Sequence, residues 1–294
     1  MKSTRAARPA CRFAAVVTAG LLWMVAAGPA TAEVFYRVEA PDGGTSWLLG
    51  TLHSEDERVV DWPPAVDRAL EEAGTLALEL VPDPDLLARL NRAMTLPPDM
   101  ALDDLVGDEL YEDVLSALSE YGMDEAGVAR LRPWAAALTL SRPPPETGMF
   151  MDFALAVRAG NRGMNLVALE TLDEQLDFLT GLGPEAHIEM LEAAVSDMRG
   201  GRELFEELVE AYLEGDAERL RTLAERELAG MDPGLAERFR REGIVERNRR
   251  MAERAAPLLD RGGTLVAVGA LHLPGPEGLV ALLRERGFEV RPVF

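Results

Sequence analysis

The chain has 294 residues, which is enough for one large domain or for two small ones that share a core. It carries 51 acidic residues against 30 basic ones, a formal net charge of −21 at pH 7. This charge disfavours nucleic acid as a partner, because binding to the phosphates depends on basic residues that displace counterions. The acids are spread over predicted helical faces rather than gathered in a tail, so we expect most of them to form a solvated surface.

The first 32 residues have the pattern of a secretory signal peptide. Four basic residues open the segment, an apolar run covers residues 13–27, and residues 30–32 read as a small-residue cleavage site. An uncleaved membrane anchor is the alternative, but it needs about 20 apolar residues, more than this run supplies. We therefore expect cleavage near Ala32, a mature chain that begins near Glu33, and a periplasmic or secreted location.

Removal of this segment excludes several kinds of catalysis. Cys11 and Lys2 are the only cysteine and the only lysine, and both lie within it. The mature chain would then have no disulfide, no thiol nucleophile and no lysine for a Schiff base. A serine hydrolase is also disfavoured, because no Gly-x-Ser-x-Gly segment occurs. The formal net charge of the mature chain would be −25, since the removed segment holds four basic and no acidic residues.

The first part of the mature chain predicts strands and one helix. Residues 34–51 form two β-type runs around the turn "PDGG", which predicts a hairpin that leads to His53. Residues 63–74, "PPAVDRALEEAG", have Pro at the start and Gly at the end of a predicted helix. Residues 75–80, "TLALEL", predict a buried strand with Glu79 at its end.

The remainder is mostly helical between two further strands. Helical patterns cover about 83–160 and 172–260, with no apolar run long enough for a membrane span. Residues 164–170, "MNLVALE", predict a strand that ends at Glu170, and Thr171 and Glu174 have the spacing of a helix capping box. Residues 262–294 predict strand, loop, helix and terminal strand, with His272 in the loop. His187, on a predicted helix, is interpreted as structural or solvated.

This order predicts an α/β fold in a single domain, residues 33–294. A mainly parallel or mixed central sheet would be flanked by helices and carry a large α-helical insert. The carboxyl ends of parallel strands lie on one edge of a sheet, which is where ligands bind. We therefore expect that edge to gather His53, Glu79, Glu170 and His272.

Two imidazoles and a carboxylate at one edge indicate a site for a divalent metal ion. His53, Glu79 and His272 would be its ligands, and Zn, Mn or Co would suit them. With an open coordination position, the ion could polarise a carbonyl and lower the pKa of bound water. Gly50 and Gly269 each precede a histidine by three residues, and tight turns there would let backbone amides approach a substrate.

Structural roles remain as alternatives for each of these residues. A histidine at a strand end can simply bond to the backbone. Glu79 can form a salt bridge with an arginine, and Glu170 can favour the start of the next helix by its charge. The occurrence of two Gly-x-x-His frames in equivalent settings favours a functional site.

Several segments together resemble the TraB/PrgY/GumN family, in particular its secreted bacterial GumN-like branch. They are "WLLGTLH", "LALEL", "LVALETLDEQL", "ERNRRMA" and "VAVGALHLPGPEGLVALLRERGFEV". The resemblance implies an α/β fold related to the Tiki metalloproteases and, more distantly, to erythromycin-esterase-like enzymes. It also implies that Glu170, Gln175, Arg247 and Asn248 belong to the site or support it.

The resulting hypothesis is an exported metal-dependent hydrolase that acts on a peptide, an amide or a small molecule. Glu170 would be a general base or a support for the ligands, and Arg247 would stabilise a developing oxyanion. Asn248 is placed with them as a catalytic residue, and Gln175 with the substrate-binding residues. The alternative is a non-catalytic protein that sequesters a peptide in the same cleft, since PrgY-like members of the family are associated with blocking a peptide pheromone.

Overall fold

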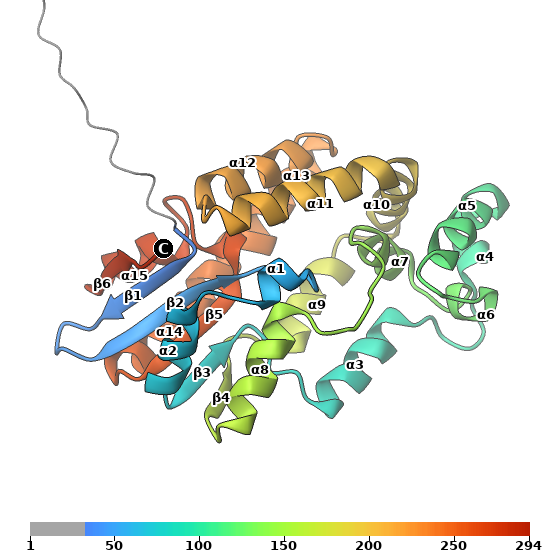
Figure 1. Cartoon of the computed structure of the whole chain (residues 1–294). Coiled ribbons are helices and arrows are strands. Elements are labelled where there is room, and N and C mark those ends of the chain that lie inside the picture. The colour runs from blue at the N-terminus through green and yellow to red at the C-terminus, as the bar shows by residue number, and fades with distance from the viewer. Residues whose placement is uncertain (1–32) are drawn as a thin grey trace, which may run out of the picture. The chain divides into compact units, whose positions relative to one another are not determined.

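A six-stranded mixed sheet organises the part of the chain that the structure describes (Figure 1). The computed structural model describes residues 33–294, so the expected signal peptide, residues 1–32, lies outside the described residues. The strand order is β4-β3-β5-β2-β1-β6. The strands are β1 Phe35–Glu39, β2 Thr45–Thr51, β3 Thr75–Leu78, β4 Asn165–Ala168, β5 Thr264–Gly269 and β6 Glu289–Pro292. β4, β3, β5 and β2 run parallel, and β1 pairs antiparallel with β2 and β6. The predicted α/β fold with a mixed sheet is confirmed.

Helices fill both segments in which they were expected. They are α1 Glu57–Val60, α2 Pro64–Glu72, α3 Pro84–Met94, α4 Leu102–Val106, α5 Asp108–Ser119, α6 Glu125–Val128, α7 Pro133–Leu140, α8 Met151–Asn161, α9 Leu172–Thr180, α10 Pro184–Ser196, α11 Met198–Leu213, α12 Ala217–Leu228, α13 Pro233–Arg238, the π-helix η1 Phe239–Val245, α14 Glu246–Asp260, the 3-10 helix η2 Ala270–His272 and α15 Leu279–Glu285. Within residues 33–294, no helix has both the length and the apolar character needed to cross a membrane.

The two faces of the sheet pack against different helices. On β5, Leu265 and Ala267 belong to an apolar cluster with α2, α8 and α11, whereas Val266 and Val268 belong to one with α14 and α15. All four side chains are buried. This double cover explains why the strand reads as a continuous apolar run rather than as an alternating one.

A third apolar cluster belongs to the helical insert. It joins α4, α5, α7 and α10 through residues such as Leu118, Trp134 and Leu191. The helices of this insert therefore bury their apolar faces mainly against one another, while the sheet is covered by α2, α8, α11, α14 and α15. The positions of functional interest lie at the ends of the parallel strands.

Candidate active site

The parallel strands bring the predicted residues to one edge of the sheet. Neighbouring strands are paired in the order β4, β3, β5 and β2, with their carboxyl ends on the same side. His53 follows the end of β2, Glu79 that of β3, Glu170 that of β4 and His272 that of β5. Residues that the sequence scatters over more than two hundred positions therefore share one edge.

Arg247 of α14 joins two carboxylates from this edge. Its Nη2 donates to Glu79 Oε2 at 2.6 Å and to Glu170 Oε2 at 2.6 Å, and its Nε donates to Glu170 Oε2 at 2.8 Å. Gln175 Nε2 reaches the same two carboxylates at 3.4 and 3.2 Å, and Arg250 Nη2 lies 3.4 Å from Glu170 Oε1. The side chain of Glu170 is fully buried. A buried carboxylate needs such partners, because leaving it unpaired away from water is costly.

The hydrogen bond that His272 donates to Asn248 determines which nitrogen of His272 carries the proton. Asn248 Nδ2 donates to the backbone oxygen of Glu277 at 2.8 Å, which directs Asn248 Oδ1 to His272 Nδ1 at 2.6 Å. Since Oδ1 can only accept, Nδ1 is the protonated nitrogen. His272 Nε2 therefore presents a lone pair, 3.7 Å from Glu79 Oε1. We call the following residues the buried site cluster: Glu79, Glu170, Gln175, Arg247, Asn248 and His272.

The pKa shifts in this cluster favour a neutral imidazole beside an anion. Burial lowers the pKa of His272, although the charge of Glu79 opposes the shift. Burial raises the pKa of Glu79, but the charges of His272 and Arg247 and the hydrogen bonds from Gly269 and Arg247 outweigh burial and leave that pKa below its usual range. Because His272 is neutral, we attribute most of the lowering to Arg247. Two acceptors, Nε2 and a carboxylate oxygen, consequently face each other at neutral pH.

His53 has a different set of neighbours. Its Nδ1 is 3.7 Å from Asp152 Oδ2, and its ring stacks on that of Phe150 with the centroids 4.0 Å apart and an interplanar angle of 19°. Thr51 Oγ1 donates to Asp152 Oδ1 at 2.6 Å. The side chain of His53 is 49% exposed, and among residues 33–294 no hydrogen bond or ion pair joins it to the buried site cluster.

The donor atoms fit a divalent metal ion in their chemistry, although they do not form a three-ligand group. Over residues 33–294, no three His, Cys, Asp or Glu side chains are grouped so that they could hold a metal. Yet His272 Nε2 and Glu79 Oε1 face each other as two lone-pair donors, a pair that suits a cation. His53 has the same type of imidazole at the same edge. These three residues would hold the ion, and their role as metal ligands stays a prediction.

Gly50 differs from the expected turn, whereas Gly269 ends β5 and directly precedes the 3-10 turn η2. Gly50 lies inside β2, where its amide donates to Val34 O at 2.7 Å, so this amide is not free for a substrate. A Cβ at Gly50 would come within 2.7 Å of Leu273 Cδ1, which shows that the glycine makes room for the segment after β5. The amide of Gly269 donates to Glu79 Oε1 at 2.7 Å. Both amides thus serve the fold and the cluster.

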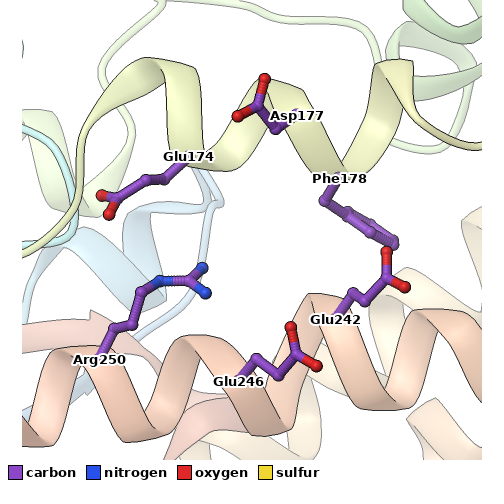
Figure 2. Close-up of a pocket in the computed structure, with 6 residues that line it drawn as sticks. All are labelled: Glu174, Asp177, Phe178, Glu242, Glu246 and Arg250. Carbon is purple, nitrogen blue, oxygen red and sulfur yellow. The ribbon is translucent and has the colours of Figure 1, made fainter.

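A hollow of about 250 Å³ lies beside the cluster, between α9 and the segment formed by η1 and α14 (Figure 2). Arg250 connects the two, since its guanidinium lines the hollow and also contacts Glu170. The hollow has a net negative lining, which consists of Glu174, Asp177, Phe178, Glu242, Glu246 and Arg250.

Sequence reasoning missed Asp152 and the arginines that follow Arg247. Asp152 occupies the first turn of a predicted helix, where an acid is usually explained by the helix dipole. Arg250 and Arg254 belong to a predicted helix in which arginines and acids alternate, a pattern that is typical of an exposed helix. Their positions three and seven residues after Arg247 put all three on one helix face, and that spacing could have indicated a row facing Glu170 and its neighbours.

Glu174 is expected to contribute to stability through its charge. Hydrogen bonds from Arg254 and Thr171 lower the pKa of Glu174 to about 2, against the opposing effect of burial. Because this pKa is depressed on folding, the contribution is present above the unfolded value of 4.5 and is lost as the pH falls towards about 2. Glu174→Gln keeps the capping-box partner of Thr171 but removes the charge. We expect urea denaturation at neutral pH to show a loss of about 2 kcal/mol, after allowance for the partial exposure of Arg254.

The adjacent acid provides the control for this prediction. Asp173 lies in the same helical turn as Glu174 and pairs with Arg89 of α3, but the side chain of Asp173 is 73% exposed. We expect Asp173→Asn to change the free energy of unfolding by less than about 0.5 kcal/mol. An equal loss in the two variants, or a Glu174→Gln loss that persists in acid, would contradict the assigned role of Glu174.

Comparison with models of protein families matches residues 34–292 to the TraB/PrgY/gumN family. The matched segment runs from the residue before β1 to the end of β6, so it includes every residue of the buried site cluster. No curated protein sequence and no solved structure gives a match.

Proposed function

The chain belongs to the TraB/PrgY/gumN family, and from this premise we propose that it is an exported hydrolase that cleaves a peptide or a related amide with a divalent metal ion. The observation that carries the proposal is the pair formed by His272 Nε2 and Glu79 Oε1, 3.7 Å apart. Two acceptors at this distance suit a bound cation, a shared proton or a water molecule that donates to both. The lowered pKa of His272 and that of Glu79 disfavour the proton.

The ion would be held by His53, Glu79 and His272, and when bound it would polarise a carbonyl and lower the pKa of bound water. Asn248 keeps the His272 lone pair available, because it holds the imidazole proton on Nδ1. This support from a neighbouring side chain is the arrangement typical of histidines that ligate metals.

Glu170 supports the site rather than acting as its base. Its side chain is fully buried, and both of its oxygens accept from arginine side chains, Arg247 and Arg250. Arg247 is 16% exposed and uses its Nε and Nη2 hydrogens on the two carboxylates. Its Nη1 has only a 3.5 Å contact with Gly243 O among the described residues. Nη1 can therefore donate to a developing oxyanion.

Gln175 is suited to orient an amide substrate. Its Nε2 is directed to the carboxylates of Glu79 and Glu170. That leaves its Oε1, which has no hydrogen bond within the described residues, as an acceptor. A peptide N–H is a donor that matches it. This polarity favours a peptide or amide over a substrate without N–H groups.

Peptide hydrolysis by the mature chain tests the proposal. A peptide library would be incubated with the chain and Zn, Mn or Co, and the products identified by mass spectrometry. We expect turnover that stops with a chelator and returns when metal is added. His187→Gln is the matched control, because this third histidine bonds to Leu179 O on the helical insert. Turnover that continues in the presence of the chelator would contradict the proposal. Binding of peptides without any turnover would support the alternative, a non-catalytic protein that sequesters a peptide.

Export is the second part of the proposal and has its own test. The signal-peptide pattern of residues 1–32 supports export, and β1 starts at Phe35, shortly after the expected cleavage site. We expect N-terminal sequencing of the protein from its native host to find a start near Glu33 in the exported fraction. A chain that starts at Met1 in the cytoplasmic fraction would contradict export.

A further inference from the structure

In both Gly-x-x-His frames, the Nδ1 atom of the histidine faces a side-chain oxygen from a helix that packs on the sheet. His272 directs Nδ1 to Asn248 Oδ1 of α14, and His53 directs Nδ1 to Asp152 Oδ2 of α8. In each case a helix on one face of the sheet supplies the oxygen, α14 from one face and α8 from the other. In neither case does a described residue hydrogen-bond to Nε2.

Asp152 is itself held in place by the strand that carries His53. Thr51 Oγ1 donates to Asp152 Oδ1 at 2.6 Å, which leaves Oδ2 for the imidazole. Thr51 is the last residue of β2 and is paired with Gly269 of β5, so this carboxylate is tied to the same edge as His272. Thr51 and Asp152 are 101 residues apart in the sequence, so only the fold creates the contact.

The plane of the His53 ring is restricted by a second neighbour. Phe150 stacks on the imidazole with the centroids 4.0 Å apart, and it comes from the residue just before α8. Asp152 lies in the first turn of the same helix. One helix start therefore supplies both an apolar surface for the ring and a charge for its Nδ1.

We propose that Asp152 is a positioning residue that keeps the proton of neutral His53 on Nδ1 and leaves Nε2 as a free acceptor. At 3.7 Å the contact is longer than a hydrogen bond, but a carboxylate still favours the proton on the nearer nitrogen. An imidazole without a partner in water carries its proton mainly on Nε2, which would remove the lone pair. What Nε2 then binds rests on the proposed function, whereas the proton position does not.

Long-range 1H–15N NMR of the imidazole nitrogens tests this directly. The spectra would be recorded on the metal-free chain at about pH 8, above the ordinary histidine pKa of about 6.5. With three histidines in the chain, His187→Gln and His272→Gln assign the signals of His53. We expect the Nδ1–H form to predominate in the wild type and the Nε2–H form in Asp152→Ala. Asp152→Asn should be intermediate, because its amide oxygen can still accept but carries no charge.

Asp67 provides the matched control. Its side chain is 32% exposed, as is that of Asp152, and it also bonds to neighbouring side chains, Trp62 and Arg158. We expect Asp67→Asn to leave the His53 spectrum unchanged. A wild-type His53 protonated on Nε2 would contradict the proposal, and so would an Asp152→Ala spectrum identical to that of the wild type. Either result would leave Asp152 with only the role of an acid in the first turn of α8. The NMR sample contains neither metal nor substrate. A lack of peptidase activity would therefore contradict the proposed function without affecting the proton position measured on His53.

Discussion

Replacing Arg247 by methionine is expected to lower the free energy of unfolding by about 3 kcal/mol or more, because removal of one partner from a buried ion pair leaves an uncompensated charge. Glu79 and Glu170 both bond to this guanidinium at 2.6 Å. After the substitution, Glu170 would keep only weak contacts, with Arg250 at 3.4 Å and Gln175 at 3.2 Å. Urea denaturation measures the loss.

The loss should shrink in acid. Arg247 contributes to the lowered pKa of Glu79, so the stabilisation from this pair is present above 4.5, the usual glutamate value, and is lost as the pH falls through the lower folded value. Below that range Glu79 is protonated and no longer needs the arginine. Glu170→Gln in the Arg247→Met background should recover part of the loss, because it removes the stranded charge.

Arg249, two residues further along the same helix, is the control for Arg247. Its side chain is 62% exposed and pairs with Glu277, which is 50% exposed. We expect Arg249→Met to cost less than about 1 kcal/mol, as exposed ion pairs usually do. Similar losses for Arg247→Met and Arg249→Met would show that Arg247 does not hold the site together.

Replacing His53 or His272 by alanine is expected to reduce metal-dependent hydrolysis by about 100-fold or more, since even a residue that only supports a metal ligand contributes about 10–100-fold. The double variant should be no worse than the worse single variant, because residues that act as a unit are not additive. Kinetics of the same peptide with all three variants measure this. If the two substitutions lowered the activity independently, so that their effects added in the double variant, His53 and His272 would not share one site.

Folding has to be followed for each histidine variant, because the two positions are not equivalent. His53 is 49% exposed, so its replacement should leave stability unchanged. His272 is buried, and its loss leaves Asn248 Oδ1 without a partner. We expect His272→Ala to lose about 1–3 kcal/mol and to remain folded.

The strand ends could be predicted from the sequence because their signals are local. β3 and β4 are short apolar runs that follow a glycine and end near an acid, and each Gly-x-x-His frame follows an apolar run. Parallel pairing then determines that these ends share one edge. The capping box of Thr171 and Glu174 is equally local, and the structure contains both of its hydrogen bonds.

The contacts that define the site could not be predicted, because they depend on residues far apart in the chain. Arg247 and Glu170 are 77 residues apart, and nothing in either segment shows that they share a buried ion pair. A glycine in a turn and a glycine at a close approach look alike in a sequence. Gly50 is of the second kind only because Leu273, from the other end of the chain, packs on it.

The π-helix before α14 is a further feature without a sequence signal. The seven residues of η1 end two residues before Arg247, and π-helical turns occur often near functional sites. Gly243 within η1 lies against the ring of Phe178, where an added Cβ would be 3.4 Å from the nearest ring atom. Hydrophobic periodicity does not distinguish such a turn from an ordinary helix. The direction in which the Arg247 side chain points could therefore not be predicted from the sequence.

The metal content of the mature chain shows whether His53, Glu79 and His272 form one site. Equilibrium dialysis against Zn, Mn or Co, followed by elemental analysis, would be applied to the wild type, His53→Ala, His272→Ala and Glu79→Gln, with His187→Gln as the control. We expect one bound ion per chain in the wild type and in the control, and none in the other three variants. Undiminished metal binding in either of the His53 and His272 variants would contradict a single site shared by the two histidines.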